Sequence, residues 1–159
     1  EVTWLPSYGP EMRGGTANCS IAISSKKIPS PIVEKADLMI VFSQQAMDKF
    51  ASEMEAGGYI LFDKNNVVST GKNEKSCAIF GLNASEHAKN IGDPRIANTL
   101  MLGALSSFVK QIDRGAFLRA IRKAFARKEK VLDINLRAFG EGEKLISNLI
   151  GREKCSQKE

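Results

Sequence analysis

The residues best suited to bind a ligand lie in one glycine-rich segment near the start of the chain. Gly9, which precedes a proline, and the pair Gly14 and Gly15 enclose Glu11 and Arg13. Glycine permits positive φ and lets the main chain approach a ligand closely. The guanidinium of Arg13 presents a planar fork of donors that matches a phosphate or a carboxylate. We therefore predict a binding or docking loop here, with a purely structural turn as the alternative.

Polar side chains also follow the apolar runs that are predicted as strands. Ser43 and Gln44 come directly after one run, and residues 63–66 follow the next. Asn98 lies in the first turn of a helix that is otherwise apolar nearly all round. Ligands of open α/β sheets bind beyond the carboxyl ends of the strands, near helix N-termini. These positions are further binding candidates, although Asn98 is equally consistent with a capping or surface amide.

The chain lacks the residues of a catalytic or metal site. His87 is its only histidine, and no G-x-S-x-G or phosphate-loop motif occurs. Cys19, Cys77 and Cys155 are too dispersed for a zinc or iron–sulfur site, and their odd number argues against a disulfide framework. We expect no catalytic residue, no metal, and a cytoplasmic location, with Cys19 and Cys77 buried as small apolar side chains.

Positive charge is concentrated in one part of the chain. The net charge is +5, but residues 110–130 alone hold eight cations and two carboxylates. Phe117 and Phe125 fall on the apolar side of the predicted helix there, so no platform for stacking bases is visible. We expect a solvated or partner-facing surface rather than a nucleic-acid site. No apolar run reaches the length of a membrane span.

Strand and helix patterns alternate, which is typical of an α/β fold with a mainly parallel sheet. The predicted strands cover residues 17–24, 38–42, 59–62 and 77–80. The predicted helices cover residues 44–55, a short segment ending at residue 90, residues 96–109, and amphipathic stretches at 117–125 and 131–139. The continuous apolar run at 38–42 predicts a central strand covered on both faces. Residues 1–150 are expected to form one domain with a helical C-terminal part, followed by a polar tail over residues 151–159.

Taken as one string, Trp4-Leu5-Pro6-Ser7-Tyr8-Gly9-Pro10-Glu11-Met12-Arg13-Gly14-Gly15-Thr16-Ala17-Asn18 resembles the γ-component signature of the 2-oxoacid:ferredoxin oxidoreductases. Similar matches follow in order along the chain. They are Ser30-Pro31-Ile32-Val33, Gln45-Ala46-Met47-Asp48-Lys49-Phe50, Asp93-Pro94-Arg95-Ile96-Ala97-Asn98 and Leu102-Gly103-Ala104-Leu105. The resemblance covers nearly the whole chain. Members of that family begin earlier, with a strand, a glycine-rich turn and a helix, so we expect residues 1–159 to lack part of the family's ligand crevice.

The resemblance implies a three-layer, Rossmann-like domain that assembles with other subunits. Thiamine diphosphate, Mg²⁺ and the iron–sulfur clusters are expected in partner α and β subunits and a ferredoxin-like δ subunit, and none in this chain alone. Coenzyme A is the implied co-substrate and ferredoxin the electron acceptor. The form of the signature loop favours 2-oxoglutarate, with branched-chain 2-oxoacids or pyruvate as alternatives. A free-standing nucleotide or acyl-CoA binding module is the competing interpretation.

The resemblance also gives the signature residues a role. We hypothesise that they line the coenzyme A crevice or contact a partner subunit, and that three later residues border the same crevice. The signature residues are Tyr8, Gly9, Glu11, Arg13, Gly14 and Gly15. The later residues are Ser43, Gln44 and Asn98.

Overall fold

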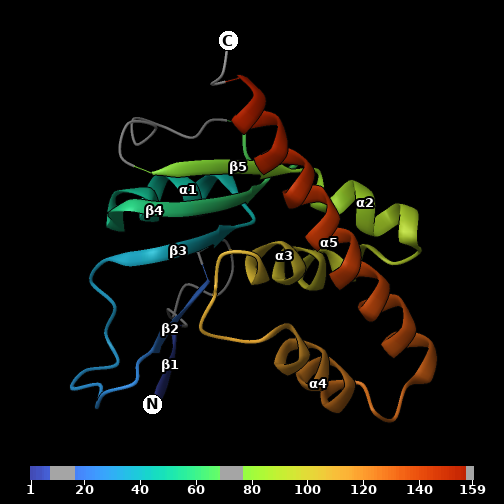
Figure 1. Cartoon of the computed structure of the whole chain (residues 1–159), viewed down its shortest axis with the longest axis horizontal. Helices are drawn as coiled ribbons and strands as arrows, with labels where there is room; N and C mark the ends of the chain where they lie inside the picture. Colours follow the sequence, from blue (N-terminus) through green and yellow to red (C-terminus); the bar gives the residue numbers. More distant parts are fainter. Residues whose placement is uncertain (8–16, 69–76, 157–159) are drawn as a thin grey trace.

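A β-hairpin opens the part of the chain that the computed structural model describes, which is residues 1–7, 17–68 and 77–156. Strands β1 (Val2–Ser7) and β2 (Asn18–Ile23) pair antiparallel, from Val2 opposite Ile23 to Ser7 opposite Asn18 (Figure 1). The pairing holds the two ends of the predicted binding loop side by side, although the loop itself, at residues 8–16, lies outside the described residues. Strand β1 was not predicted, because glycine and proline dominate the segment that it enters.

A separate parallel sheet forms the centre of the molecule. Its strands, in the order of pairing, are β3 (Ala36–Val41), β4 (Met54–Asp63) and β5 (Ala78–Leu82). The sequence predicted a central position for residues 38–42, which is wrong for this sheet because β3 lies at its edge and β4 in the middle. Burial agrees with that order, since Ile60 and Leu61 of β4 are fully buried whereas only Val41 of β3 is.

Helices cover both faces of the parallel sheet, which confirms the predicted three-layer arrangement (Figure 1). The helices are α1 (Gln44–Phe50), α2 (Ala84–Ile91), α3 (Ala97–Ser106), α4 (Arg114–Ala124) and α5 (Glu129–Ser156). One face packs against α1 through Met47 and Ile60. The other packs against α2, α3 and α5 through Leu61 and Leu100. Helix α4 lies away from the sheet and packs on α5.

Several element boundaries differ from the prediction. Helix α1 ends at Phe50, a 3₁₀ turn η1 (Ala51–Glu53) follows, and β4 begins where the helix was expected to continue. The Gly57-Gly58 pair therefore lies inside β4, where the register shifts against β3 and Gly57 adopts a φ of +80°. Helix α5 also continues to Ser156, so the first residues of the predicted polar tail are helical.

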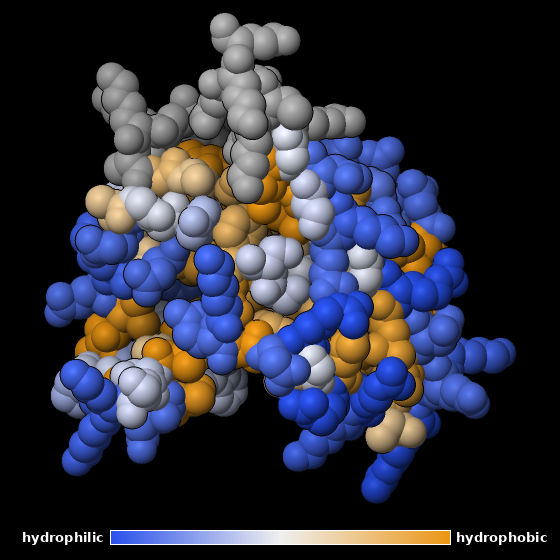
Figure 2. All heavy atoms as spheres, in the orientation of Figure 1, coloured by the Kyte–Doolittle hydropathy of each residue, from blue (hydrophilic) through white to orange (hydrophobic). Residues whose placement is uncertain are grey.

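The buried side of the hairpin was predicted wrongly. Cys19 was expected to be buried, and Ile21 and Ile23 share its side of β2, but all three side chains are exposed. Trp4 pairs opposite Ile21 and is 64% exposed, and Val2 opposite Ile23 is 66% exposed. We call these five residues the hairpin apolar face, and Figure 2 shows hydrophobic surface in this region. Alternation identifies two faces of a strand, but it does not determine which one finds a partner.

Cys77 is also less buried than predicted. Its side chain is partly exposed and its sulfur lies 3.5 Å from the main-chain oxygen of Glu55. Cys77 is the first described residue after residues 69–76 and directly precedes β5. It therefore lies at the margin of the sheet rather than inside the core.

Glycine allows α3 and α5 to pack closely. A Cβ atom at Gly103 would overlap the main-chain oxygen of Phe139, and one at Gly142 would overlap that of Leu100. Leu100, Met101 and Ala104 are fully buried, as the apolar composition of α3 predicted. The two glycines therefore determine how near the long C-terminal helix can approach the helix that covers the sheet.

We predict that Gly142→Ala lowers the free energy of unfolding by about 1–3 kcal/mol, because the new methyl group must displace the main chain of α3. Gly140→Ala, on the same helix, is the matched control, since nothing lies within 4 Å of its added Cβ. The free energy of unfolding of this control should stay the same or rise by up to about 1 kcal/mol, because alanine has the higher helix propensity. Urea denaturation measures both, and equal stabilities would contradict the close contact.

Candidate functional site

The carboxyl edge of the parallel sheet is organised by a fully buried carboxylate, Asp63, at the end of β4. Its Oδ2 accepts hydrogen bonds from Asn66 Nδ2 at 2.9 Å and from the hydroxyl of Ser85. Its Oδ1 accepts from the main-chain N–H groups of Asn65, at 3.2 Å, and Ser85. Because Ser85 lies in the first turn of α2, Asp63 holds the loop after β4 against that helix, where a negative charge is favourable.

The same loop is also joined to α1. Ser43 caps α1, with its Oγ accepting from the N–H of Ala46 at 3.2 Å. Gln44 donates from Nε2 to Asp48 at 2.7 Å and accepts at Oε1 from the N–H of Val68 at 2.9 Å. The structure therefore brings together two candidate places that the sequence treated separately, the Ser43–Gln44 corner and the loop after β4. These side chains bond within the chain and fix the edge of the sheet.

Asn98 makes a local contact in the first turn of α3. Its Oδ1 accepts a hydrogen bond from the N–H of Thr99 at 2.8 Å, and the residue is exposed. Thr99 is instead buried and donates from Oγ1 to Asn135 Oδ1 at 2.5 Å, while Asn135 Nδ2 donates to the Val131 oxygen. The sequence did not single out Asn135, although a polar residue among the apolar positions of α5 was the available signal.

A glycine and a capping aspartate form the junction before α3. Gly92, with a φ of +129°, ends α2, and Asp93 caps the 3₁₀ turn η3 (Pro94–Ile96) by accepting from the N–H of Arg95 at 2.9 Å. The Arg95 guanidinium also donates to both carboxylate oxygens of Asp93, from Nε to Oδ1 at 2.9 Å and from Nη2 to Oδ2 at 2.6 Å. These hydrogen bonds, first from the side chain and then from the main chain of Arg95, lower the pKa of Asp93 to about 2.

Six of the nine predicted site residues fall outside the described residues. They are Tyr8, Gly9, Glu11, Arg13, Gly14 and Gly15. Their role stays a prediction, but the described hairpin determines where their loop begins and ends, since Ser7 and Asn18 are paired neighbours. These six signature residues thus lie in the part of the chain that joins the two paired strands.

Within the described residues, no group of three His, Cys, Asp or Glu side chains is arranged to hold a metal ion. His87 Nδ1 lies 3.6 Å from Glu141 Oε1, which connects α2 with α5. None of the helices in this part of the chain has the length and apolar character to cross a bilayer. The arrangement can position a loop and two helix ends.

Comparison with known proteins gives the family. A model of the family described as pyruvate ferredoxin/flavodoxin oxidoreductase matches residues 1–145. The chain belongs to this family. Members of the pyruvate ferredoxin/flavodoxin oxidoreductase family among its relatives are named as enzyme subunits. The resemblance that the signature loop suggested is therefore confirmed at the level of the family.

Two relatives and one solved structure show the extent of the match. The chain is 40% identical to the ketoisovalerate oxidoreductase subunit VorA of Methanothermobacter marburgensis, over 89% of its own length and 29% of that protein. It is 31% identical to the 2-oxoglutarate synthase subunit KorC of Methanocaldococcus jannaschii, over 94% of its own length and 79% of that protein. The γ subunit of a keto/oxoacid ferredoxin oxidoreductase from Geobacter sulfurreducens superposes with a TM-score of 0.76 at 26% identity, covering 93% of this chain and 81% of that one. The chain thus spans less than a third of the VorA relative.

We predict that Asp63→Asn lowers the free energy of unfolding by about 1–3 kcal/mol, because an amide places donor hydrogens against buried donors that now point at a carboxylate. Asp48→Asn is the control, since Asp48 is exposed and accepts a bond at the surface. It should change stability by less than about 0.5 kcal/mol. Denaturation curves compare the two variants, and equal effects would contradict a role for Asp63 in holding the edge of the sheet.

The Asp93 carboxyl should titrate with a midpoint near 2 rather than 3.8. Because the pKa in the folded state is the lower one, the contact with Arg95 stabilises the fold above pH 3.8, and that contribution disappears as the pH falls through 2. Carbon-detected NMR of the carboxyl groups measures the midpoint. Arg95→Ala should move it towards 3.8, whereas Arg119→Ala should leave it in place, and a wild-type midpoint of 3.8 would rule out the contact.

Proposed function

We propose that this chain is the γ component of a thiamine-diphosphate- and iron–sulfur-dependent 2-oxoacid:ferredoxin oxidoreductase. The overall reaction converts a 2-oxoacid, coenzyme A and oxidised ferredoxin to an acyl-CoA, carbon dioxide and reduced ferredoxin. The chain contributes assembly and the positioning of coenzyme A, and partner subunits hold the cofactors, which supply the carbanion and electron-transfer chemistry. The family match and the subunit names of the relatives support this assignment.

The hairpin apolar face is the observation that carries the proposal. Large apolar side chains that gather on one exposed face mark contact sites in soluble proteins. Trp4 and Ile21 lie opposite each other at the middle of this face, and aromatic side chains are frequent energetic centres of interfaces. We assign the face to contact with the thiamine-binding partner subunit. The signature loop leaves the same hairpin, so the contact would hold that loop at the boundary between subunits.

Coenzyme A fits the signature loop better than the described edge of the sheet. The polar groups at that edge, Ser43, Gln44 and Asp63, already bond within the chain. Helix α1, which Ser43 caps, has only seven residues. A guanidinium such as that of Arg13 has paired donors that match a phosphate of coenzyme A. We therefore propose Arg13 as the coenzyme A contact and Ser43 and Gln44 as the support of the neighbouring edge.

Two substrate classes remain in the proposal. The loop sequence favours 2-oxoglutarate, the 2-oxoacid that appears in the name of the KorC relatives. The branched-chain alternative is supported by the higher identity, 40%, to a ketoisovalerate oxidoreductase subunit. A side-by-side assay with 2-oxoglutarate and 2-oxoisovalerate in the same complex decides between them.

The test is co-expression with the candidate thiamine-binding subunits. We expect a complex that contains thiamine diphosphate and a brown iron–sulfur chromophore and that depends on coenzyme A. Trp4→Ser should weaken assembly at least about tenfold, through the loss of an anchor side chain. Val68→Ser is its matched control, because Val68 is 90% exposed but lies outside the hairpin.

In the assembled complex, Arg13→Ala should raise the KM for coenzyme A about tenfold or more, as expected for the loss of a hydrogen bond to a charged group. An unchanged KM with unchanged assembly would remove Arg13 from both proposed roles. A wild-type chain that stays monomeric beside those subunits, and binds nucleotides or acyl-CoA alone, would instead identify a free-standing binding module.

A further inference from the structure

A compact group of cations lies where α4 ends and α5 begins. Residues 122–130 contain five basic side chains and one carboxylate, Glu129, so this short segment has a net charge of +4 in a chain of net charge +5. All five are exposed. We call them the cationic corner, and they are Arg122, Lys123, Arg127, Lys128 and Lys130.

The cations of the corner differ from their neighbours in having no carboxylate partner. Arg114 forms a two-pronged ion pair with Glu143, at 2.7 Å and 2.9 Å, and Arg119 pairs with Asp113 at 3.3 Å. Among the described residues, no ion pair involves any member of the corner. The fold thus neutralises the start and middle of α4 and leaves its end, with the turn that follows, uncompensated.

Helix stability accounts for only part of this charge. Arg122 and Lys123 lie in the last turn of α4, where cations interact favourably with the helix dipole. Lys128 and Lys130 lie at the start of α5, since the Lys128 oxygen accepts the N–H of Leu132. Cations at a helix N-terminus are unfavourable. Lys128, Lys130 and Arg127 in the turn therefore do not stabilise the local fold. Their presence indicates a role in binding another molecule.

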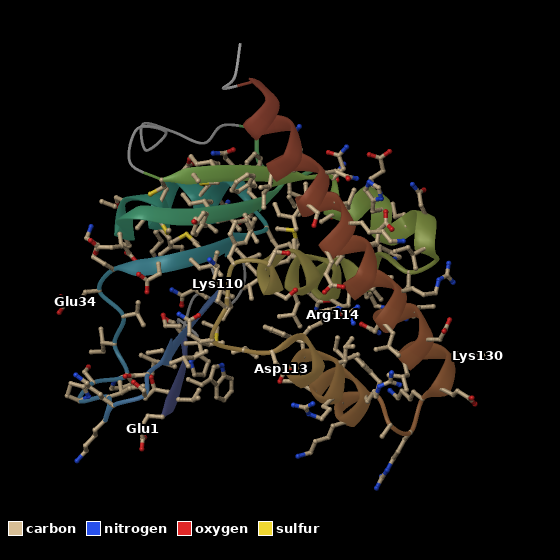
Figure 3. All side chains as sticks on the ribbon, in the orientation of Figure 1. Glu1, Glu34, Lys110, Asp113, Arg114 and Lys130 are labelled. Carbon is tan, nitrogen blue, oxygen red and sulfur yellow. The ribbon has the colours of Figure 1, made fainter. Side chains whose placement is uncertain are left out.

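The packing of α4 directs these side chains outward. Phe117 and Ile121 are buried against Phe139 of α5, so the apolar side of α4 faces inward. Figure 1 shows the turn between α4 and α5 at an outer corner of the molecule, away from the sheet. Lys130 projects there in Figure 3, and Figure 2 shows hydrophilic side chains extending from the same corner. A partner could therefore approach the corner without meeting the hairpin.

We propose that the cationic corner docks an acidic surface of another subunit in the assembly, a second contact beyond the hairpin apolar face. This inference rests on the proposed function, because it takes the partner to be a subunit of the same enzyme. Complementary charge accelerates association and fixes orientation more than it adds affinity at high salt. A nucleic acid is the less suitable partner, since Phe117 is buried and Phe125 partly buried, which leaves no exposed ring beside the cations.

The experiment measures assembly of the full chain with the partner subunits at 50 and 300 mM NaCl. We expect the wild-type association to weaken several-fold or more at the higher salt, because exposed charge pairs are screened. Arg127→Glu with Lys128→Glu should weaken association at 50 mM NaCl by about tenfold or more and remove most of the dependence on salt. Circular dichroism confirms folding of the variant, which alters only exposed side chains.

The matched control is Lys89→Glu with Lys144→Glu, which changes the net charge equally at exposed positions on α2 and α5. It should retain wild-type association to within about twofold, since charges outside a contact contribute little. Equal behaviour of the two double variants, or a wild-type association that salt leaves unchanged, would overturn the cationic corner while leaving the proposed function intact. Failure of the wild type to assemble would remove both. The wild type could instead bind duplex DNA as tightly as it binds the subunits, and the double variant Arg127→Glu with Lys128→Glu could lose that binding. This result would reassign the corner to nucleic acid.

Discussion

Close approach of α3 and α5 is the constraint on which the helical side of the molecule depends. The main chains meet at Gly103 and Gly142, where no side chain could be accommodated without displacement. At that separation Thr99 and Asn135 reach each other with a buried hydrogen bond. Because α3 lies directly on the sheet, its distance to α5 also determines how the core beneath both helices is filled.

Helix α5 then serves as the frame for the outer helices. Glu141 faces His87 of α2, and Glu143 holds Arg114 at the start of α4. Phe139 provides the apolar contact for α4. The cationic corner is a consequence of this arrangement, since the apolar side of α4 is fixed against α5 and its charged end can only face outward. The position of the cationic corner on the surface thus follows from the buried contact between α4 and α5.

The edge of the sheet shows a similar dependence on buried groups. Asp63 and Gln44 come from different strand ends, and together they immobilise the segment after β4. A carboxylate without exposure needs its full set of donors, so the loop adopts the conformation that supplies them. The described part of the chain therefore fixes the positions of three surfaces. They are the hydrogen-bonded edge of the parallel sheet, the hairpin apolar face and the cationic corner. This arrangement agrees with the proposed role of the chain, in which partner subunits hold the cofactors.

Local sequence determined much of this protein. The Gly92-Asp93-Pro94 junction was predictable because capping and ring geometry act within a few residues, and the α/β class followed from hydrophobic periods. The family resemblance came from the gapless signature string and from the matches that follow it along the chain. Tertiary structure decided the rest. Strand order made β3 an edge, the apolar side of β2 stayed exposed, and Asp63 and Asn135 acquired partners distant in sequence. Hydrophobic patterns specify that a face is to be covered, but only the packed chain determines whether its own residues or another subunit covers it.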